Sequence, residues 1–125
     1  MDENEISYII RGAIFTTYNA LGPGLLESAY EVVLCHILLE KGLTVKRQVP
    51  VPIIFNGMKL KVGYRIDLLV NNLVIIELKS IEMLAAVHHK QVLTYLKLSG
   101  IKLGLLVNFN TVNIAESIHR KVNGL

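Results

Sequence analysis

The chain has 125 residues, a formal net charge of +3, 52% hydrophobic residues and 18% charged residues. This length makes one domain, so we expect a single domain over residues 1–125, and the apolar share excludes intrinsic disorder as the main state. The mean hydropathy of +0.47 does not indicate a membrane protein. A spanning helix needs about 20 consecutive apolar residues, and every uncharged run here is shorter or interrupted by polar residues, glycine or proline.

The N-terminal half begins with two predicted helices. An apolar stripe predicts the first helix over residues 6–19. The Gly-Pro-Gly sequence at 22–24 interrupts it. A second helix is expected over residues 25–41 and ends at Gly42, a residue type favoured just after a helix.

Three strands follow, because three runs rich in β-branched and apolar residues are joined by two turns that contain asparagine. The strands are expected over residues 44–55, 59–70 and 73–79, and the turns at 56–57 and 71–72. The two prolines of the first run place part of it at a sheet edge or a bulge.

The last third returns to helix and then strand. We expect a helix over residues 84–99, closed by Gly100, and a buried strand over 102–108 that can lie parallel to the strand before the helix. The segment 114–122 fits a helix and a strand equally well. This order of elements predicts a small α/β domain with a mixed sheet.

Acidic residues in two neighbouring strands are the strongest chemical signal. Glu77 and Lys79 lie two residues apart at the end of an apolar strand and therefore point to one face; an ordinary ion pair is the alternative. Asp67 lies in the preceding strand. A symmetric hairpin places residue 67 opposite residue 76, so a bulge is needed to bring Asp67 beside Glu77. Two adjacent carboxylates repel unless a cation lies between them, and carboxylate oxygens suit Mg²⁺ or Mn²⁺.

These residues resemble a known family pattern. Asp67, followed by Glu-Leu-Lys at 77–79, resembles the signature of the PD-(D/E)XK nuclease superfamily. Residues 24–30 read Gly-Leu-Leu-Glu-Ser-Ala-Tyr and match G-x-x-E-x-x-Y, and the stretches 91–96 and 104–109 also fit. The chain is therefore identified as a member of the GxxExxY protein family, a small branch of that superfamily, over roughly residues 6 to 122.

The resemblance implies a restriction-endonuclease-like, three-layer α/β/α core with a central mixed β-sheet. It implies that Asp67 and Glu77 bind Mg²⁺ or Mn²⁺, that the Leu78 carbonyl is a third ligand, and that Lys79 assists the attacking water. The proline that usually precedes the first acid is replaced by Ile66, a departure that the superfamily tolerates.

Further site residues follow from the same resemblance. Glu27 would be the helical acid of the metal site, and Gln91 would lie near the metal or the scissile phosphate. Tyr30, His88 and Tyr95 would support the site or contact the substrate. The alternatives are structural: Glu27 also suits the first turn of a helix, and Tyr30 also suits the core.

Basic residues gather on the first predicted hairpin. They could follow a nucleic-acid backbone, or they could form a solvated edge that resists aggregation. The residues concerned are Lys46, Arg47, Lys59, Lys61 and Arg65, and Lys90 on the third helix joins the candidate phosphate contacts.

The expected function is a metal-dependent phosphodiesterase of nuclease type that hydrolyses a nucleic-acid backbone, with DNA favoured over RNA. One alternative is a binding or self-assembling module that keeps the acidic site without turnover. A small-molecule phosphohydrolase is another. We also expect a homo-oligomer, a dimer or larger, because a domain of this size has little surface with which to grip a duplex. An acidic start and a single cysteine, Cys35, predict a cytoplasmic location.

Overall fold

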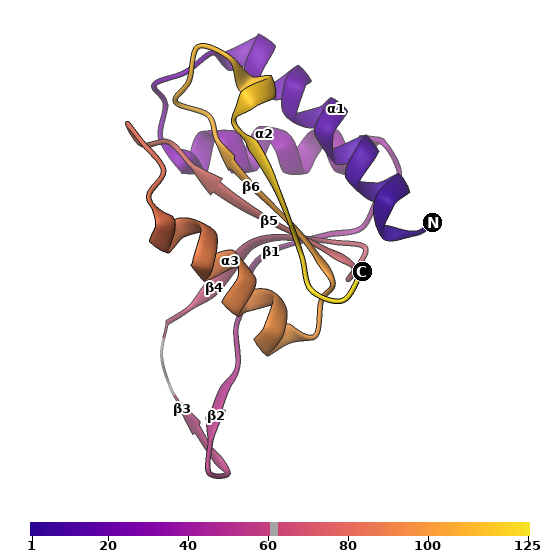
Figure 1. Ribbon diagram of the computed structural model, residues 1–125. Coiled ribbons are helices and arrows are strands. Elements are labelled where there is room, and N and C mark those ends of the chain that lie inside the picture. The colour runs from indigo at the N-terminus through magenta and orange to yellow at the C-terminus, as the bar shows by residue number, and fades with distance from the viewer. Residues whose placement is uncertain (61–62) are drawn as a thin grey trace.

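A five-stranded mixed sheet separates two helical layers in the computed structural model, which describes residues 1–60 and 63–125 (Figure 1). The helices are α1 (Glu3–Leu21), α2 (Glu27–Glu40) and α3 (Ala86–Ser99). The strands are β1 (Val45–Pro50), β2 (Ile53–Phe55), β3 (Met58–Leu60), β4 (Arg65–Val70), β5 (Val74–Lys79), β6 (Leu103–Asn108) and β7 (Ile118–Val122). Helices α1 and α2 lie on one face and α3 on the other (Figure 1). The expected three-layer α/β/α architecture is confirmed.

The sheet has the order β1-β4-β5-β6-β7, and the pair β5–β6 is parallel. All the other neighbours in it are antiparallel. Helix α3 is the crossover between the parallel strands, as the sequence predicted. A Cβ added to Gly104 in β6 would lie 2.9 Å from a methyl carbon of Val92, so glycine at this position permits the close packing of α3 on the sheet.

Two apolar clusters hold the layers together. The larger lies between the sheet and the α1/α2 layer, and there Tyr30 stacks on Phe109 with 4.2 Å between ring centroids. The smaller lies under α3 and joins Ile75 to Tyr95 and Leu96. Helix α1 contributes its predicted stripe, and the side chain of Asp2 caps its start by accepting a hydrogen bond from the N–H of Glu5 at 2.8 Å.

The first two predicted strands are each divided in the structure. Residues 44–55 contain β1 and β2, separated at residues 51–52, and residues 59–70 contain the end of β3 and all of β4. Strands β2 and β3 form a separate two-stranded ribbon that projects from the sheet (Figure 1). The break has a local cause, because Pro52 has no N–H to donate to a neighbouring strand. The predicted second strand also included residues 61–62, which lie outside the described residues.

The sequence left helix and strand open for residues 114–122, and the structure shows a short helical turn followed by a strand. Residues Ile114–Glu116 form one short 3₁₀ turn, and β7 then adds an antiparallel edge strand beside β6. Within the described residues, no helix combines the length and the apolar character needed to cross a membrane.

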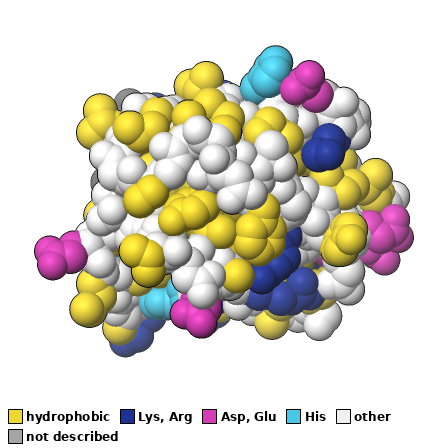
Figure 2. Space-filling model, turned by 90° about the horizontal axis from the view of Figure 1, so that it is seen from above, with side chains coloured by type: hydrophobic (Ala, Val, Ile, Leu, Met, Phe, Trp, Pro, Cys, Tyr) yellow, Lys and Arg dark blue, Asp and Glu magenta, His cyan; other side chains and the backbone are white. Residues whose placement is uncertain are grey.

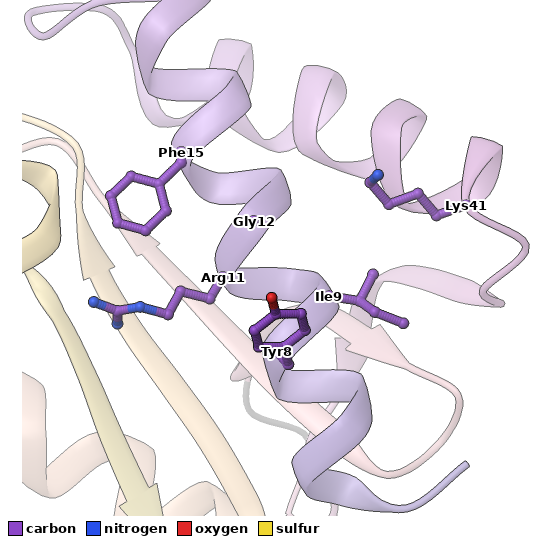
Figure 3. A pocket seen from close by; sticks show the side chains of 6 residues that line it. All are labelled: Tyr8, Ile9, Arg11, Gly12, Phe15 and Lys41. Carbon is purple, nitrogen blue, oxygen red and sulfur yellow. The ribbon is translucent and has the colours of Figure 1, made fainter.

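The outer face of the α1/α2 layer is partly apolar. Figure 2 looks down on this layer, and hydrophobic side chains gather across its middle. On α2 and the residue before it, Leu26 and Val32 are 78% and 50% exposed. A separate hollow of about 600 Å³ lies along α1 (Figure 3), where Arg11 stacks over Phe15 at 5.4 Å. Its charged lining residues, Arg11 and Lys41, are both basic.

Candidate active site

The β4–β5 hairpin brings the two predicted acids together. The strands pair Val70 with Val74 and Leu68 with Ile76, and one further step of this register places Asp67 opposite Glu77. The expected bulge is therefore wrong. The connection has three residues rather than two, because Asn71 and Asn72 both adopt left-handed backbone angles, with φ of 50° and 55°. Asparagine tolerates this conformation better than most residues.

The backbone pairing of β4 with β5 stops after Leu68 and Ile76, and the two carboxylates take its place at the next pair of residues. The N–H of Asp67 donates to Oε1 of Glu77 at 3.1 Å. In return, the N–H of Leu78 donates to Oδ2 of Asp67 at 2.8 Å. Each acid is thus held by the backbone of the opposite strand. This reciprocal arrangement fixes both carboxylates at one end of the hairpin.

Burial and mutual repulsion make this pair electrostatically costly. Glu77 is only 3% exposed. Its burial and the neighbouring charge of Asp67 raise its pKa to about 8. Burial also raises the pKa of Asp67. The positive charge of Lys79 opposes both shifts but is outweighed. A carboxylate pair with this character gains stability from a bound cation.

Lys79 and Tyr95 complete the α3 side of the site. Glu77 and Lys79 follow Ile75 by two and four residues in β5, so the three side chains point to the same face of the sheet. Ile75 packs against Tyr95 on that face. Burial and the charges of Glu77 and Asp67 raise the pKa of Tyr95 to about 12. The carbonyl of Lys79 accepts a hydrogen bond from Phe109 at 2.8 Å, and this contact anchors the end of β5.

Helix α2 presents two acids toward this end of the sheet. Glu27, the predicted helical acid, is exposed, and its Oε1 accepts a hydrogen bond from the N–H of Ser80 at 3.3 Å. Glu31, one turn later, is 6% exposed and forms an ion pair with Arg47 at 2.9 Å. Sequence reasoning missed Glu31, although its i+4 spacing from Glu27 placed both on one helix face.

Gln48 links Glu31 to the carboxylate pair. Its amide Nε2 donates to Oε1 of Glu31 at 2.6 Å and lies 3.4 Å from Oδ1 of Asp67. The β1–β4 register places Gln48 opposite Asp67. Gln48 has a φ of 52° within β1, an uncommon conformation for a residue other than glycine, and such strain clusters at functional sites. Gln48 was also missed, because no sequence pattern predicts a glutamine with a left-handed backbone conformation.

Two of the predicted supporting residues contact other groups. The hydroxyl of Tyr30 donates to the carbonyl of Gly22 at 2.6 Å and accepts from the N–H of Leu25 at 3.1 Å. The ring itself is fully buried, so Tyr30 fixes the loop before α2. The Nδ1 of His88 accepts from the N–H of Ala85 at 2.8 Å and caps the start of α3.

The remaining predicted residues surround the site or lie on the surface. Gln91 is half-buried and lines a cavity together with Tyr95. Lys46, Arg65 and Lys90 are exposed, and Arg65 donates to the carbonyl of Gln48 at 3.3 Å. Lys61 lies outside the described residues.

The donor set fits a hard divalent cation. Carboxylate and carbonyl oxygens are the ligands that Mg²⁺ and Mn²⁺ use. Buried Glu77 and half-buried Asp67 repel each other, and the charge of Lys79 does not cancel the rise in their pKa values. Within residues 1–60 and 63–125, no group of three histidine, cysteine or acidic side chains is gathered to hold a metal. A cation here would therefore rely on the pair, the backbone and water.

A mixed sheet between helical layers, with an acid pair and a lysine where a hairpin ends, defines a nuclease-like α/β domain. The sequence model of the PD-(D/E)XK nuclease superfamily matches residues 4–121. The chain belongs to this superfamily. Comparison with the curated proteins gives no match, and neither does comparison with the solved structures.

Proposed function

We propose that this protein is a metal-dependent nuclease that hydrolyses the phosphodiester backbone of nucleic acid, with DNA preferred to RNA. The observation that carries the proposal is the Asp67–Glu77 pair, held by reciprocal backbone hydrogen bonds beside Lys79. Membership of the superfamily supports nuclease activity in general. The preference for DNA rests on the family resemblance.

Asp67, Glu77 and the carbonyl of Leu78 would hold Mg²⁺ or Mn²⁺. When bound, such an ion lowers the pKa of water and neutralises charge on the phosphate. Lys79 shares the face of Glu77, so its ammonium donates a hydrogen bond to the attacking water and offsets charge that develops on the phosphate. The backbone N–H of Ser80, the residue after Lys79, donates a hydrogen bond to Glu27. We propose that Glu27 binds water associated with the metal.

The other residues position substrate. Gln91 and Tyr95 are four residues apart on one face of α3 and line one cavity, so their amide and phenol would donate hydrogen bonds to phosphate oxygens of the substrate. Lys46, Arg65 and Lys90 are exposed cations for backbone phosphates. Arg47 is paired with Glu31, so its main role is to neutralise that buried acid.

Three finer assignments complete the proposal. We propose that the chain is a GxxExxY-type member of the superfamily, on the motif at residues 24–30. We propose a reducing, cytoplasmic location, which the single, unbridged Cys35 supports. We also propose self-association through the apolar outer face of α2, which exposes Leu26 and Val32.

The function is tested by incubating labelled single- and double-stranded DNA and RNA with the protein in Mg²⁺, Mn²⁺ or EDTA. We expect metal-dependent cleavage that falls by roughly 100-fold or more in Glu77→Gln and Lys79→Met, a loss typical of catalytic groups. Glu116→Gln and Lys102→Met are matched controls at exposed positions and should retain activity. Undiminished cleavage in both site variants would refute the assignment. No cleavage by the folded wild type would favour a binding or assembly role.

A further inference from the structure

A second cavity lies on the α3 side of the sheet, the side that Glu77 and Lys79 face. It has a volume of about 340 Å³ and is lined by residues of α3, by Ile53 at the start of β2 and by Tyr64 just before β4. Its lining includes Ile53, Tyr64, Gln91, Thr94 and Tyr95. This volume is within the range of small-ligand pockets, which are about 300–1,000 Å³. Tyr95 lines this cavity and also packs in one cluster with Ile75, whose face of β5 carries Glu77.

Two aromatic rings, those of Tyr64 and Tyr95, line the cavity. Tyr64 is 45% exposed. Its ring meets that of Tyr95 edge to face, with 6.5 Å between centroids and an interplanar angle of 61°. The backbone of Tyr64 is fixed, because its carbonyl accepts a hydrogen bond from the N–H of Val51 at 2.9 Å. An aromatic ring that is held at its base and half open to solvent is a platform for stacking.

Polar and charged groups surround this platform on α3. Gln91 supplies an amide with both donor and acceptor atoms, and Thr94 supplies a hydroxyl. Lys90, an exposed residue, adds a positive charge to the lining. An apolar wall, an aromatic face, an amide and a nearby cation are the groups that recognise a nucleobase joined to a phosphate.

We infer that this cavity binds an unpaired nucleobase next to the scissile phosphate. The inference rests on the proposed nuclease function and names its substrate class. A phosphate at Asp67 and Glu77 places its neighbouring nucleotide toward Tyr95, and the base then stacks on Tyr64. Bases inside a duplex are stacked on one another and cannot do so. The substrate is therefore a single strand, a flap or a loop rather than a continuous duplex.

The test uses 2-aminopurine, a fluorescent base analogue whose emission is quenched by stacking. Single-stranded DNA carrying it is titrated with protein in Ca²⁺, and paired duplex DNA and single-stranded RNA are run alongside. We expect the wild type and Tyr64→Phe to quench the single-stranded signal. Tyr64→Ala and the volume-keeping Tyr64→Leu should bind single strands about 5- to 150-fold more weakly, the range for loss of one stacked base, with no quenching.

Matched controls separate stacking from unfolding. Tyr8 is 81% exposed on α1, so Tyr8→Ala should bind all probes like the wild type. Duplex affinity should be the same in Tyr64→Leu and the wild type. The inference is overturned if Tyr64→Leu binds single strands and quenches their fluorescence like the wild type. It is also overturned if the substitution weakens binding of duplex DNA as much as binding of single strands. If nucleic acid is cleaved but without preference for unpaired substrates, the inference fails while the nuclease proposal stands; if nothing is cleaved, the nuclease proposal fails first.

Discussion

At the scale of single residues, the raised pKa of Glu77 makes the folding stability depend on pH. Its pKa is about 8 in the folded chain, against an ordinary value of 4.5. Between these values the folded protein keeps a proton that the unfolded chain has released, so folding stability falls as pH rises. This contribution is complete below a pH of about 4.5 and is lost as the pH rises to about 8.

We therefore expect the melting temperature of the metal-free wild type to fall from pH 5 to pH 8, and to fall much less in Glu77→Gln. Thermal melts followed by circular dichroism in EDTA measure this difference, with Glu116→Gln as the exposed control. Addition of Mn²⁺ at pH 8 should raise the melting temperature of the wild type, because a cation stabilises the ionised pair. Parallel pH profiles for the wild type and Glu77→Gln would contradict the buried acid pair.

Gln48 permits a separate test of its backbone and its side chain. Its φ of 52° favours glycine, whereas its amide bridges Glu31 and Asp67. Gln48→Gly should be more stable than Gln48→Ala by about 1 kcal/mol, because only alanine retains the strained backbone.

Both variants lack the amide, so both should bind Mn²⁺ equally and more weakly than the wild type. Calorimetric titration with Mn²⁺ and denaturant melts provide the two readouts. Wild-type affinity for Mn²⁺ in both variants would show that the bridge does not position Asp67.

At the scale of elements, Tyr30 connects the loop at residues 22–25 to α2. Tyr30→Phe removes the hydroxyl that joins Gly22 to Leu25 and should cost about 0.5–1.5 kcal/mol of unfolding free energy, because hydrogen bonds of partly buried groups are lost. Urea denaturation measures this loss, and Tyr8→Phe, at an exposed position, is the matched control. An unchanged midpoint in Tyr30→Phe would show that water replaces the hydroxyl without cost.

The elements also show which features local sequence determines. The apolar run ending in Glu77 and Lys79 predicted β5 and its shared face, because strand periodicity is local. The hairpin offset was wrong, because a left-handed pair of asparagines lengthened the loop by one residue. The Glu31–Gln48 contact joins residues 17 apart. It depends on how α2 packs against β1, which no local pattern contains.

At the scale of the whole molecule, layering explains why one helix face remains apolar. The α1/α2 layer already buries its inner stripe against the sheet, so residues such as Leu26 and Val32 on the outer face are not needed for the core. Large exposed apolar patches indicate interaction sites, and a two-fold dimer would bury the same patch on both copies. A dimer would also double the surface available to a polymeric substrate.

We expect light scattering to give a mass twice the chain's 14.0 kDa for the wild type. The double substitution Leu26→Ser and Val32→Ser removes apolar area mainly from the outer face, where the side chains are 78% and 50% exposed. It should therefore return the mass to that of one chain without lowering the melting temperature of the monomer. Thr16→Ala with Asn19→Ala, at exposed positions on α1, is the control and should leave the mass at the dimer value. A wild type of 14.0 kDa across the concentration range would contradict self-association and leave each copy to act alone on its substrate.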